Sequence, residues 1–498
     1  MSTGISKGVR AGLLASSLML LEACAVGPNF RPPAPPSTDH YTPEPVPTVT
    51  ASSDAPGGSV QHFVTDGEVP ADWWRMFGPQ PLDALVQRAL KDSPTIAAAQ
   101  ATLRSASESY RGERSLLAPS VDATAGATRE RDSSASFGLP FPSSLYNLYT
   151  TSVQVTYKLD LFGGNRRQIE AARAQADYQR YELEAARLTL ADNVVTTAIS
   201  IGSLKAQLAA IHDIVAGERD QLAVTERQLK AGTASHADVL SQQAQLAQTE
   251  ATVPDLEKQL AQAYHRLAVL AGETPDHLEL SDLELDAINL PTELPVSVPA
   301  RLVRQRPDVQ AAEAQLHQAT AQVGVATANL LPSLSLTGSI GSDATATQSL
   351  LSAGTGVWNV GASLSQPIFH GGQLLAQRRE AIANLEVAQA NYRETVLTAM
   401  QQVADTLRAL EADARDLKAQ LEAEEAARAS LAIARRQFAA GLNSHLAVLI
   451  AERQYLQARE SRVLAQAARY SDSVALLQAL GGGWWNRAPD DEKTASNR

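Results

Sequence analysis

The side chains that most often perform chemistry in proteins are sparse and scattered in this sequence. Its nine histidines form no His-Glu-x-x-His pair and no other spacing typical of metal ligands. The FGGN stretch at residues 162–165 lacks the Gly-Lys-Ser/Thr ending of a phosphate-binding loop, and punctuation between a strand and a helix explains it better. We therefore predict neither catalytic residues nor a metal or cofactor site.

The single cysteine, Cys24, is the residue whose position does indicate chemistry. It follows a positively charged start and an apolar run of about 11 residues, the layout of a secretory signal peptide over residues 1–23. That run is shorter than the ~20 residues that cross a bilayer as a helix. Leu21 and Ala23 resemble a bacterial lipobox, although Glu22 departs from it. We expect export and a covalent lipid, palmitate and diacylglycerol, on Cys24; the alternative is an ordinary signal peptide with an incidental cysteine.

Composition narrows the class of protein further. Only 5% of the 498 residues are aromatic, and the helix formers Ala, Gln, Leu, Glu and Arg are abundant. The formal charge of −12 disfavours nucleic acid as a partner, because binding to phosphates needs clustered Lys and Arg. Residues 24–72 are so rich in Pro, Ser and Thr that we expect an extended tether or equatorial wrapping segment there.

The rest of the chain carries an internal duplication. KAGTASHADVL at 230–240 matches AAGLNSHLAVL at 439–449, and Gly232 and Gly441 are 441 − 232 = 209 positions apart. A repeat of about 210 residues is a tandem domain, since solenoid units are ~20–50 residues long. We predict a first repeat over 73–275, a linker or equatorial segment over 276–300, a second repeat over 301–482 and a C-terminal tail over 483–498.

Each repeat contains a long helical segment. Residues 373–440 contain neither Gly nor Pro across 440 − 373 + 1 = 68 positions, which at ~1.5 Å per residue is a helix on the order of 100 Å. Such a helix needs partner helices, and a leucine-rich seam at spacings of 3 and 4 indicates coiled-coil packing. The seam of the first repeat is interrupted by Glu218 and Thr225, and Pro254 should kink the helix that returns.

The repeated stretch is the turn between the helices of each repeat. Gly232 and Gly441 suit a helix end because glycine adopts positive φ without steric cost. Candidate caps of the next helix are Thr233, Ser235 and Ser444.

Two histidines, His236 and His445, recur at the same offset within these turns. Histidine can sense pH near neutrality, but solvated turn residues are the better interpretation of both.

A second periodicity occurs four times, at residues 121–128, 151–159, 333–340 and 358–365. In each stretch apolar and polar side chains alternate strictly, and the length of about ten residues matches a transmembrane β-strand with a lipid face and a lumen face. A soluble hairpin is the alternative for any one of them. Four strands cannot close, because known membrane barrels start near eight. We therefore predict a barrel shared by three chains, with 3 × 4 = 12 strands.

Several stretches resemble the TolC-like outer membrane factor family, in particular the NodT-type efflux outer membrane lipoproteins. They are CAVGPNFRPP after the signal segment, DWWRMFGPQPLDALVQRAL at 72–90, RQRPDVQAAEAQL at 304–316, ANLLPSLSLTGSIG at 328–341 and WNVGASLSQPIFHGG at 358–372. The resemblance implies a mainly α fold with a β-barrel part: a long antiparallel α-helical coiled-coil tunnel and four transmembrane strands per chain, closing as a 12-stranded barrel in a homotrimer.

The resemblance also implies a function. It predicts the outer-membrane exit duct of a tripartite efflux system, lipid-anchored and extending into the periplasm. The duct would passively conduct small toxic compounds from an RND- or MFS-type inner-membrane pump and a periplasmic adaptor, also called a membrane fusion protein. A duct for type I protein secretion and a structural periplasmic coiled-coil lipoprotein stay open as alternatives.

In that family the repeated turns meet the adaptor and form the inner aperture. This chain departs from the family after the second turn, where HLAVLIAERQ stands in place of the usual aspartates, so we expect an apolar constriction there. By resemblance, the adaptor-contact candidates are Gly232, Thr233, Ser235, Gly441, Leu442 and Ser444. The aperture candidates are Asp238, Leu446, Leu449 and Ile450.

Overall fold

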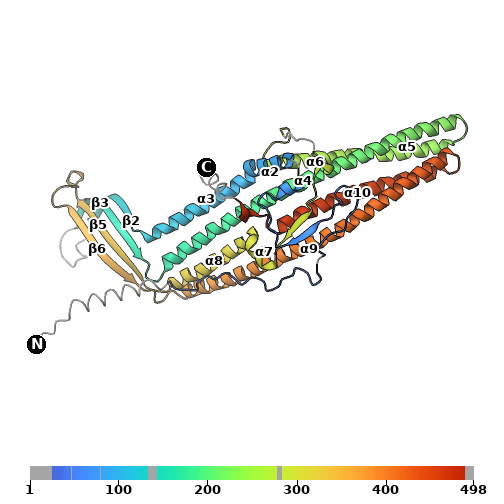
Figure 1. Cartoon of the computed structure of the whole chain (residues 1–498). Helices are drawn as coiled ribbons and strands as arrows, with labels where there is room; N and C mark the ends of the chain where they lie inside the picture. Colours follow the sequence, from blue (N-terminus) through green and yellow to red (C-terminus); the bar gives the residue numbers. More distant parts are fainter. Residues whose placement is uncertain (1–24, 46, 79, 133–142, 278–282, 488–498) are drawn as a thin grey trace. The chain divides into compact units, whose positions relative to one another are not determined.

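The computed structural model describes residues 25–45, 47–78, 80–132, 143–277 and 283–487. The predicted signal segment, Cys24 and residues 488–498 of the predicted tail lie outside the described residues. The chain (Figure 1) folds into two compact units, and each draws on both predicted repeats. Of the described residues, those of unit 1 fall within 25–32, 103–179 and 312–392, and those of unit 2 within 33–102, 180–311 and 393–487.

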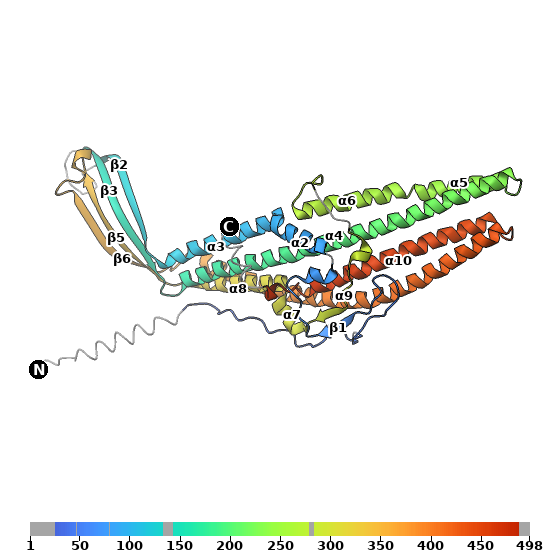
Figure 2. The ribbon, with the colours of Figure 1, turned by 45° about the horizontal axis from the view of Figure 1, so that its top comes forward.

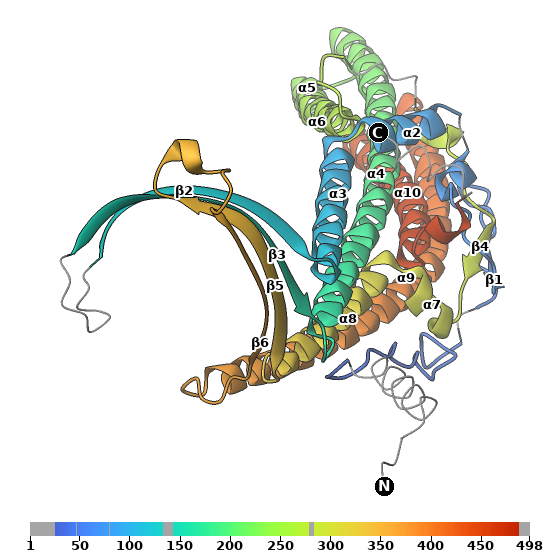
Figure 3. The same ribbon diagram turned by 90° about the vertical axis from the view of Figure 1, so that its left-hand side faces the viewer.

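A four-stranded antiparallel sheet lies in the described part of unit 1. Its spatial order is β2 (Ser120–Asp132), β3 (Ser144–Leu159), β5 (Ser333–Ala344) and β6 (Gly356–Ser365). Each of the four predicted alternating segments falls inside one of these strands, which confirms them. Figure 3 shows that the sheet is strongly curved.

The strand register places the four predicted apolar faces on one side of the sheet. Trp358 is 78% and Ile340 68% exposed, so no described residue covers this side. The opposite side is polar, and Thr124 and Ser152 are joined there by a hydrogen bond of 2.9 Å between their hydroxyl groups. One row on the apolar side is Ala123, Val153, Ile340 and Trp358, and the adjacent row on the polar side is Asp122, Gln154, Ser339 and Asn359.

Four helices connect to the sheet. Helices α3 (Pro94–Arg114) and α8 (Pro307–Ala328) lead into it, whereas α4 (Gly164–Lys230) and α9 (Gln373–Ala439) follow it. The β3–α4 turn contains Gly163 at φ +77°.

The start of α4 is capped from this turn. The Asp160 carboxylate accepts hydrogen bonds from the backbone N–H groups of Asn165, at 2.9 Å, and Arg166, at 3.0 Å. These bonds satisfy donors that have no partner within the helix. The FGGN stretch therefore forms the turn from strand β3 into helix α4, in agreement with the prediction.

The helices of unit 2 form two antiparallel hairpins. Helix α4 is followed by α5 (His236–Glu250) and α6 (Val253–Ala271), and α9 is followed by α10 (His445–Ala479). Figure 2 shows α5 and α6 returning along α4, and α10 returning along α9. Helices α4 and α9 each have 67 residues, which confirms the long helices expected from the scarcity of Gly and Pro.

The returning helix is interrupted at Pro254, where the sequence predicted a kink. Helix α5 ends at Glu250 and α6 begins at Val253, and the two residues between them, Ala251 and Thr252, keep right-handed helical backbone angles. Pro254 is the second residue of α6, where its missing N–H costs nothing because first-turn donors have no partner within the helix.

The N-terminal segment of unit 2 is held against α10 by a buried arginine. Arg469 is fully buried, and its guanidinium donates to the side chains of Gln61 and Thr50 and to the carbonyls of Gly57 and Ser59. Arg469 thus holds residues 50–61 against α10, and a hydrogen bond of 3.0 Å from the Gln61 side-chain amide to the Ser473 hydroxyl adds to this contact.

The remaining elements of unit 2 are short. Strand β1 (His62–Thr65), which the sequence did not predict, pairs in parallel with β4 (Glu293–Val296). Trp73 and Phe77, in the 3-10 helix Trp73–Phe77, and Leu82 of α2 (Gln80–Asp92) are almost fully buried. The other short helices are α2 (Gln80–Asp92) and α7 (Pro299–Gln305).

Candidate functional site

The first turn, residues 231–235, closes α4 with the expected glycine. Gly232 has φ +78°, and no described atom outside its chain neighbours lies within 4 Å of a side chain placed there. Thr233 donates to the carbonyl of Gln228 from both its backbone N–H, at 2.9 Å, and its hydroxyl, at 3.1 Å. The prediction that Thr233 caps the next helix is therefore wrong, because its hydroxyl bonds to the carbonyl of Gln228 near the end of α4.

The start of α5 has a complete capping box. The Asp238 carboxylate accepts from the Ser235 backbone N–H, at 2.9 Å, and from the Ser235 hydroxyl, at 2.7 Å, and the Asp238 N–H donates back to that hydroxyl. These bonds from Ser235 lower the pKa of Asp238 below its usual value. The predicted cap at Ser235 is confirmed, and the aperture role of Asp238 stays a prediction.

The second turn, residues 440–444, repeats the backbone without that cap. Gly441 has φ +70°, and the Leu442 N–H donates to the carbonyl of Gln437 at 2.9 Å. Ser444 occupies the N-cap position of α10, but its hydroxyl makes no capping bond among the described residues. Its backbone N–H donates instead to the side-chain carbonyl of Asn443 at 2.8 Å.

An apolar stripe follows the second turn. Leu442 is 80%, Leu446 62% and Ile450 46% exposed, while Leu449 is half-buried. Leu446 and Ile450, four residues apart on α10, share one face of that helix, and Leu442 lies in the turn before it. The stripe fits the apolar constriction expected here, whose role stays a prediction.

The interpretation of His445 as a solvated turn residue is wrong. Its side chain is only 4% exposed, and its ring centroid lies 5.2 Å from that of Phe438 on α9. The reason is helical periodicity: His445 is the first residue of α10, so it shares a face with Val448, which is fully buried against α9. His236, the equivalent residue of the first turn, is exposed as predicted.

Buried carboxylates lie further along the same hairpins. Glu218 on α4, noted as an interruption of the seam, is 1% exposed and accepts from Thr249 at 3.1 Å and Gln245 at 3.3 Å. Burial, followed by the like charge of Glu452, raises the pKa of Glu218. Glu452 on α10 is 2% exposed and pairs with Arg435 on α9 at 2.7 Å.

Residues 25–30 are docked in unit 1 near the base of the sheet, which the sequence did not predict. The Val26 N–H donates to the carbonyl of Phe162 at 3.0 Å. Arg167, on α4 and 4% exposed, donates to the Val26 carbonyl at 3.2 Å and to the Asn29 side chain at 2.6 Å. Its third contact is an ion pair of 2.7 Å with Glu170.

The docked segment also contacts α8. Phe30 stacks on His317 with ring centroids 4.3 Å apart, and His317 Nε2 lies 2.8 Å from Glu170 Oε1. Gly27, at φ +91°, lies against Gly324, where an added Cβ would come within 2.5 Å of the Gly324 Cα. Helices from both predicted repeats therefore hold the segment that begins directly after Cys24.

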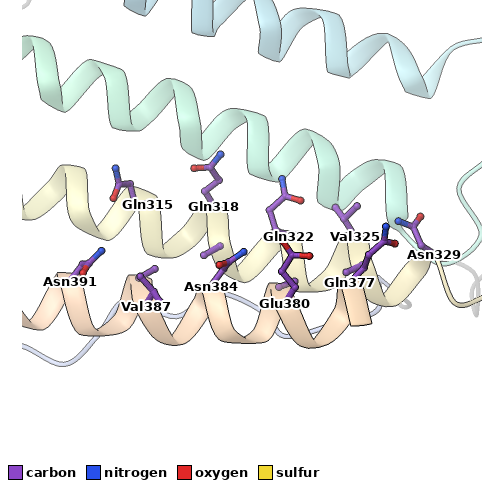
Figure 4. Close-up of a pocket in the computed structure, with 14 residues that line it drawn as sticks. Gln315, Gln318, Gln322, Val325, Asn329, Gln377, Glu380, Asn384, Val387 and Asn391 are labelled. Carbon is purple, nitrogen blue, oxygen red and sulfur yellow. The ribbon is translucent and has the colours of Figure 1, made fainter. Parts of the chain in front are cut away.

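A polar groove of about 650 Å³ lies between α8 and α9 in unit 1 (Figure 4). Its lining offers amides and one carboxylate, that of Glu380, but no nucleophile beside a general base. This surface can exchange hydrogen bonds with water or a solute. Two rows of amides at intervals of seven residues line it: Gln315, Gln322 and Asn329 on α8, and Gln377, Asn384 and Asn391 on α9.

No candidate metal site is found among the described residues. No group of three or more His, Cys, Asp or Glu side chains is arranged there to hold an ion.

Long antiparallel helices together with a curved sheet that is apolar on one side and polar on the other define the class of outer-membrane channel subunits. The family model for outer membrane efflux proteins matches residues 85–273 and 298–482. The chain belongs to this family.

Known proteins resemble the chain over most of its length. The pyoverdine export outer membrane protein OpmQ of Pseudomonas aeruginosa is 31% identical over 416 residues, covering 83% of this chain and 87% of that protein. The toluene efflux pump outer membrane protein TtgC of Pseudomonas putida is 27% identical over 485 residues, 97% of each. The solved outer-membrane channel OprN matches with a TM-score of 0.83 at 30% identity, covering 93% of this chain and 100% of that one.

These similarities confirm the predicted family, the predicted fold of a helical tunnel with a β part, and the predicted role. The protein is an outer-membrane efflux channel that serves as an exit duct and extends into the periplasm.

Proposed function

We propose that the channel is a homotrimer whose three sheets close one 12-stranded barrel. The observation that carries this proposal is the open sheet with its uncovered apolar side. Among the described strands β2 pairs only with β3, and β6 only with β5, so each has a free edge. Unpaired backbone groups are costly in lipid, and pairing β6 of one copy with β2 of the next would satisfy both edges and give 3 × 4 = 12 strands.

The partners we propose are a periplasmic adaptor, with the two turns as its contact surface, and an inner-membrane pump of the RND or MFS type. Gly232, Thr233, Ser235, Gly441, Leu442 and Ser444 are all exposed, which supports a docking role. Binding of an adaptor at both turns would connect the duct to a pump in a tripartite assembly.

Small toxic compounds are the substrates we propose. OpmQ is named for pyoverdine export and TtgC for toluene efflux, so relatives that match this chain over most of their length export small molecules. Type I protein secretion would use the same architecture. Deletion of the gene should sensitise cells to small toxic compounds and leave protein secretion unchanged; the reverse would favour the secretion duct.

The barrel proposal is tested by charge placed on either side of β3. Val155→Arg puts a cation on the apolar side, where it should cost about 2–4 kcal/mol at mid-membrane, and should reduce the heat-sensitive trimer seen on gels of outer membranes. Thr156→Arg, on the polar side, is the matched control and should assemble normally. Leu336→Arg and Ser335→Arg repeat the comparison on β5, and equal effects on both sides would contradict the proposal.

We also propose that Cys24 carries palmitate and diacylglycerol. The docking of Val26 on Phe162 and Arg167 supports it, because a lipid on a residue so near in the chain would be held beside the β3–α4 turn at the base of the sheet. Cys24→Ser should abolish incorporation of labelled palmitate and leave part of the trimer, since the barrel also holds the protein in the membrane. Undiminished labelling would contradict lipidation at this residue.

A further inference from the structure

The His445 side chain is buried and makes no hydrogen bond to the described residues. Its Nδ1 and Nε2 atoms are both buried, and neither has a partner among the described residues. A buried polar side chain without partners loses its hydrogen bonds to water and forms none in the protein, which costs free energy. Leucine or isoleucine would fill the same apolar space between α9 and α10 without that cost. The imidazole therefore needs an explanation other than packing.

The surroundings of His445 favour its neutral form. Its ring lies against Phe438 and beside a cluster formed by Leu431, Ala434, Val448 and Ala451. It is also the first residue of α10, where the positive end of the helix dipole repels a cation. Burial lowers the pKa of His445 below its usual 6.5, and this effect outweighs the opposite influence of nearby carboxylates.

Two carboxylates attract a protonated His445 without bonding to it. Asp238 faces it from α5 and Glu452 from α10 itself. Asp238 is already held by Ser235 in the capping box of the first turn. In its present position against Phe438 the ring is hydrogen-bonded to neither carboxylate.

The other charged groups around this site come from α9 and α4. Arg435 on α9 pairs with Glu452 at 2.7 Å, which reduces the attraction of that carboxylate for a second cation. Glu218 on α4 acts on Glu452 and is bonded to Gln245 and Thr249 of the first hairpin. Asp238 and Glu452 thus act on His445 directly, whereas Arg435 and Glu218 act on Glu452.

We propose that His445 is a proton-operated latch for the second turn: the neutral ring holds the start of α10 against α9, and protonation expels the ring and loosens the turn. The first turn has no such latch, because His236 is exposed and the capping box closes that turn. The effect on adaptor binding or on the aperture follows only if the proposed function holds, but the loosening itself does not depend on it.

The direction of the pH effect follows from linkage. A histidine whose pKa is lower in the folded than in the unfolded state binds its proton more weakly when folded, so acid destabilises the fold. The second turn should therefore keep its full stability above pH 6.5, the usual value for histidine, and lose it as the pH falls below 6.5. For opening coupled to one proton, the opening constant rises towards about tenfold per pH unit within that range.

Hydrogen–deuterium exchange of the purified full-length protein in detergent tests the proposal. Peptides covering residues 436–450 and 228–242 report the two turns, each corrected for the intrinsic exchange rate at each pH. Between about pH 7.5 and pH 5.5, opening of the second turn should increase several-fold, towards the tenfold per pH unit given by linkage. The first turn should remain unchanged.

Three variants complete the experiment. His445→Leu and His445→Gln cannot be protonated and should abolish the pH dependence, whereas His236→Gln, the matched change at the repeated position, should retain it. If His445→Leu does not assemble, the Gln variant and the wild-type comparison of the two turns still decide. Equal pH dependence of both turns in the wild type, or its persistence in both His445 variants, would overturn the proposal. Because no adaptor or pump is present, failure here is distinct from failure of the proposed function.

Discussion

The first and second turns have the same backbone but different means of holding the helix that follows. Gly232 and Gly441 both have positive φ, 209 positions apart. After the first turn, Ser235 and Asp238 form a capping box at the surface. After the second, Ser444 makes no capping bond within the described chain, and the start of α10 is fixed by burial of its first side chain.

This difference separates what a helical turn requires from what it tolerates. Reversal of a helix needs a residue that accepts positive φ, and glycine does so without strain. The first turn of the next helix has unpaired N–H groups that a side chain or water can satisfy, so a polar cap and an apolar contact are both workable. Duplication has preserved the first requirement and varied the second.

Replacing the glycine that both turns share should have the largest effect on the stability of the turns. Gly232→Val or Gly441→Val places a β-branched residue at positive φ, which costs about 1–3 kcal/mol. Both should raise hydrogen exchange at their own turn by a similar factor, because no described atom crowds either position. The double variant should form normal trimer in the outer membrane, crosslink weakly to the adaptor and lose export.

Asparagine, which tolerates positive φ better than valine, is the matched control at both glycines. Full export with both glycines replaced by valine would show that the geometry of the turns is not the docking surface. A strong effect at one turn alone would show that their backbones are not equivalent in solution.

Removing the capping box, which only the first turn has, should have an intermediate effect on stability. Asp238→Ala deletes the capping box and should weaken the start of α5 by about 1 kcal/mol, measured as faster exchange of residues 236–242. The pKa of Asp238 is lowered, so its contribution is present above the usual aspartate pKa and is lost as the pH falls through the lowered value. An unchanged first turn would mean that the box seen here contributes nothing in solution.

Building a capping box into the second turn should have the smallest effect on stability. Ala447 lies three residues after Ser444, the position that Asp238 holds relative to Ser235. Ala447→Asp should complete a capping box and stabilise the start of α10 by about 0.5 kcal/mol, measured as slower exchange of residues 445–450. Ala447→Asn is the uncharged control, and a destabilised α10 would show that the apolar contact of His445 excludes a polar cap here.

Local patterns in the sequence determined much of this protein. The 68 positions without Gly or Pro predicted α9, since nothing in that run interrupts a helix. Strict alternation predicted the four strands because side chains of a strand point to opposite faces in turn. The glycines of the two turns were identified by their repeat, and their positive φ follows from the backbone alone.

Only the tertiary structure decided what depends on residues far apart in the chain. The sequence does not show which helix Thr233 caps, because its hydroxyl can reach either end of the turn. Nor does it show that His445 is buried, because the packing of α10 on α9 decides which side of the first turn of α10 faces the other helix. The docking of Val26 on Arg167, 141 positions away, has no periodic signal. The periodicity of a helix or strand and the residues of a turn depend on neighbours in the chain, so a sequence pattern specifies them. The burial of a side chain depends on which surfaces of distant elements meet, and a sequence pattern does not specify that.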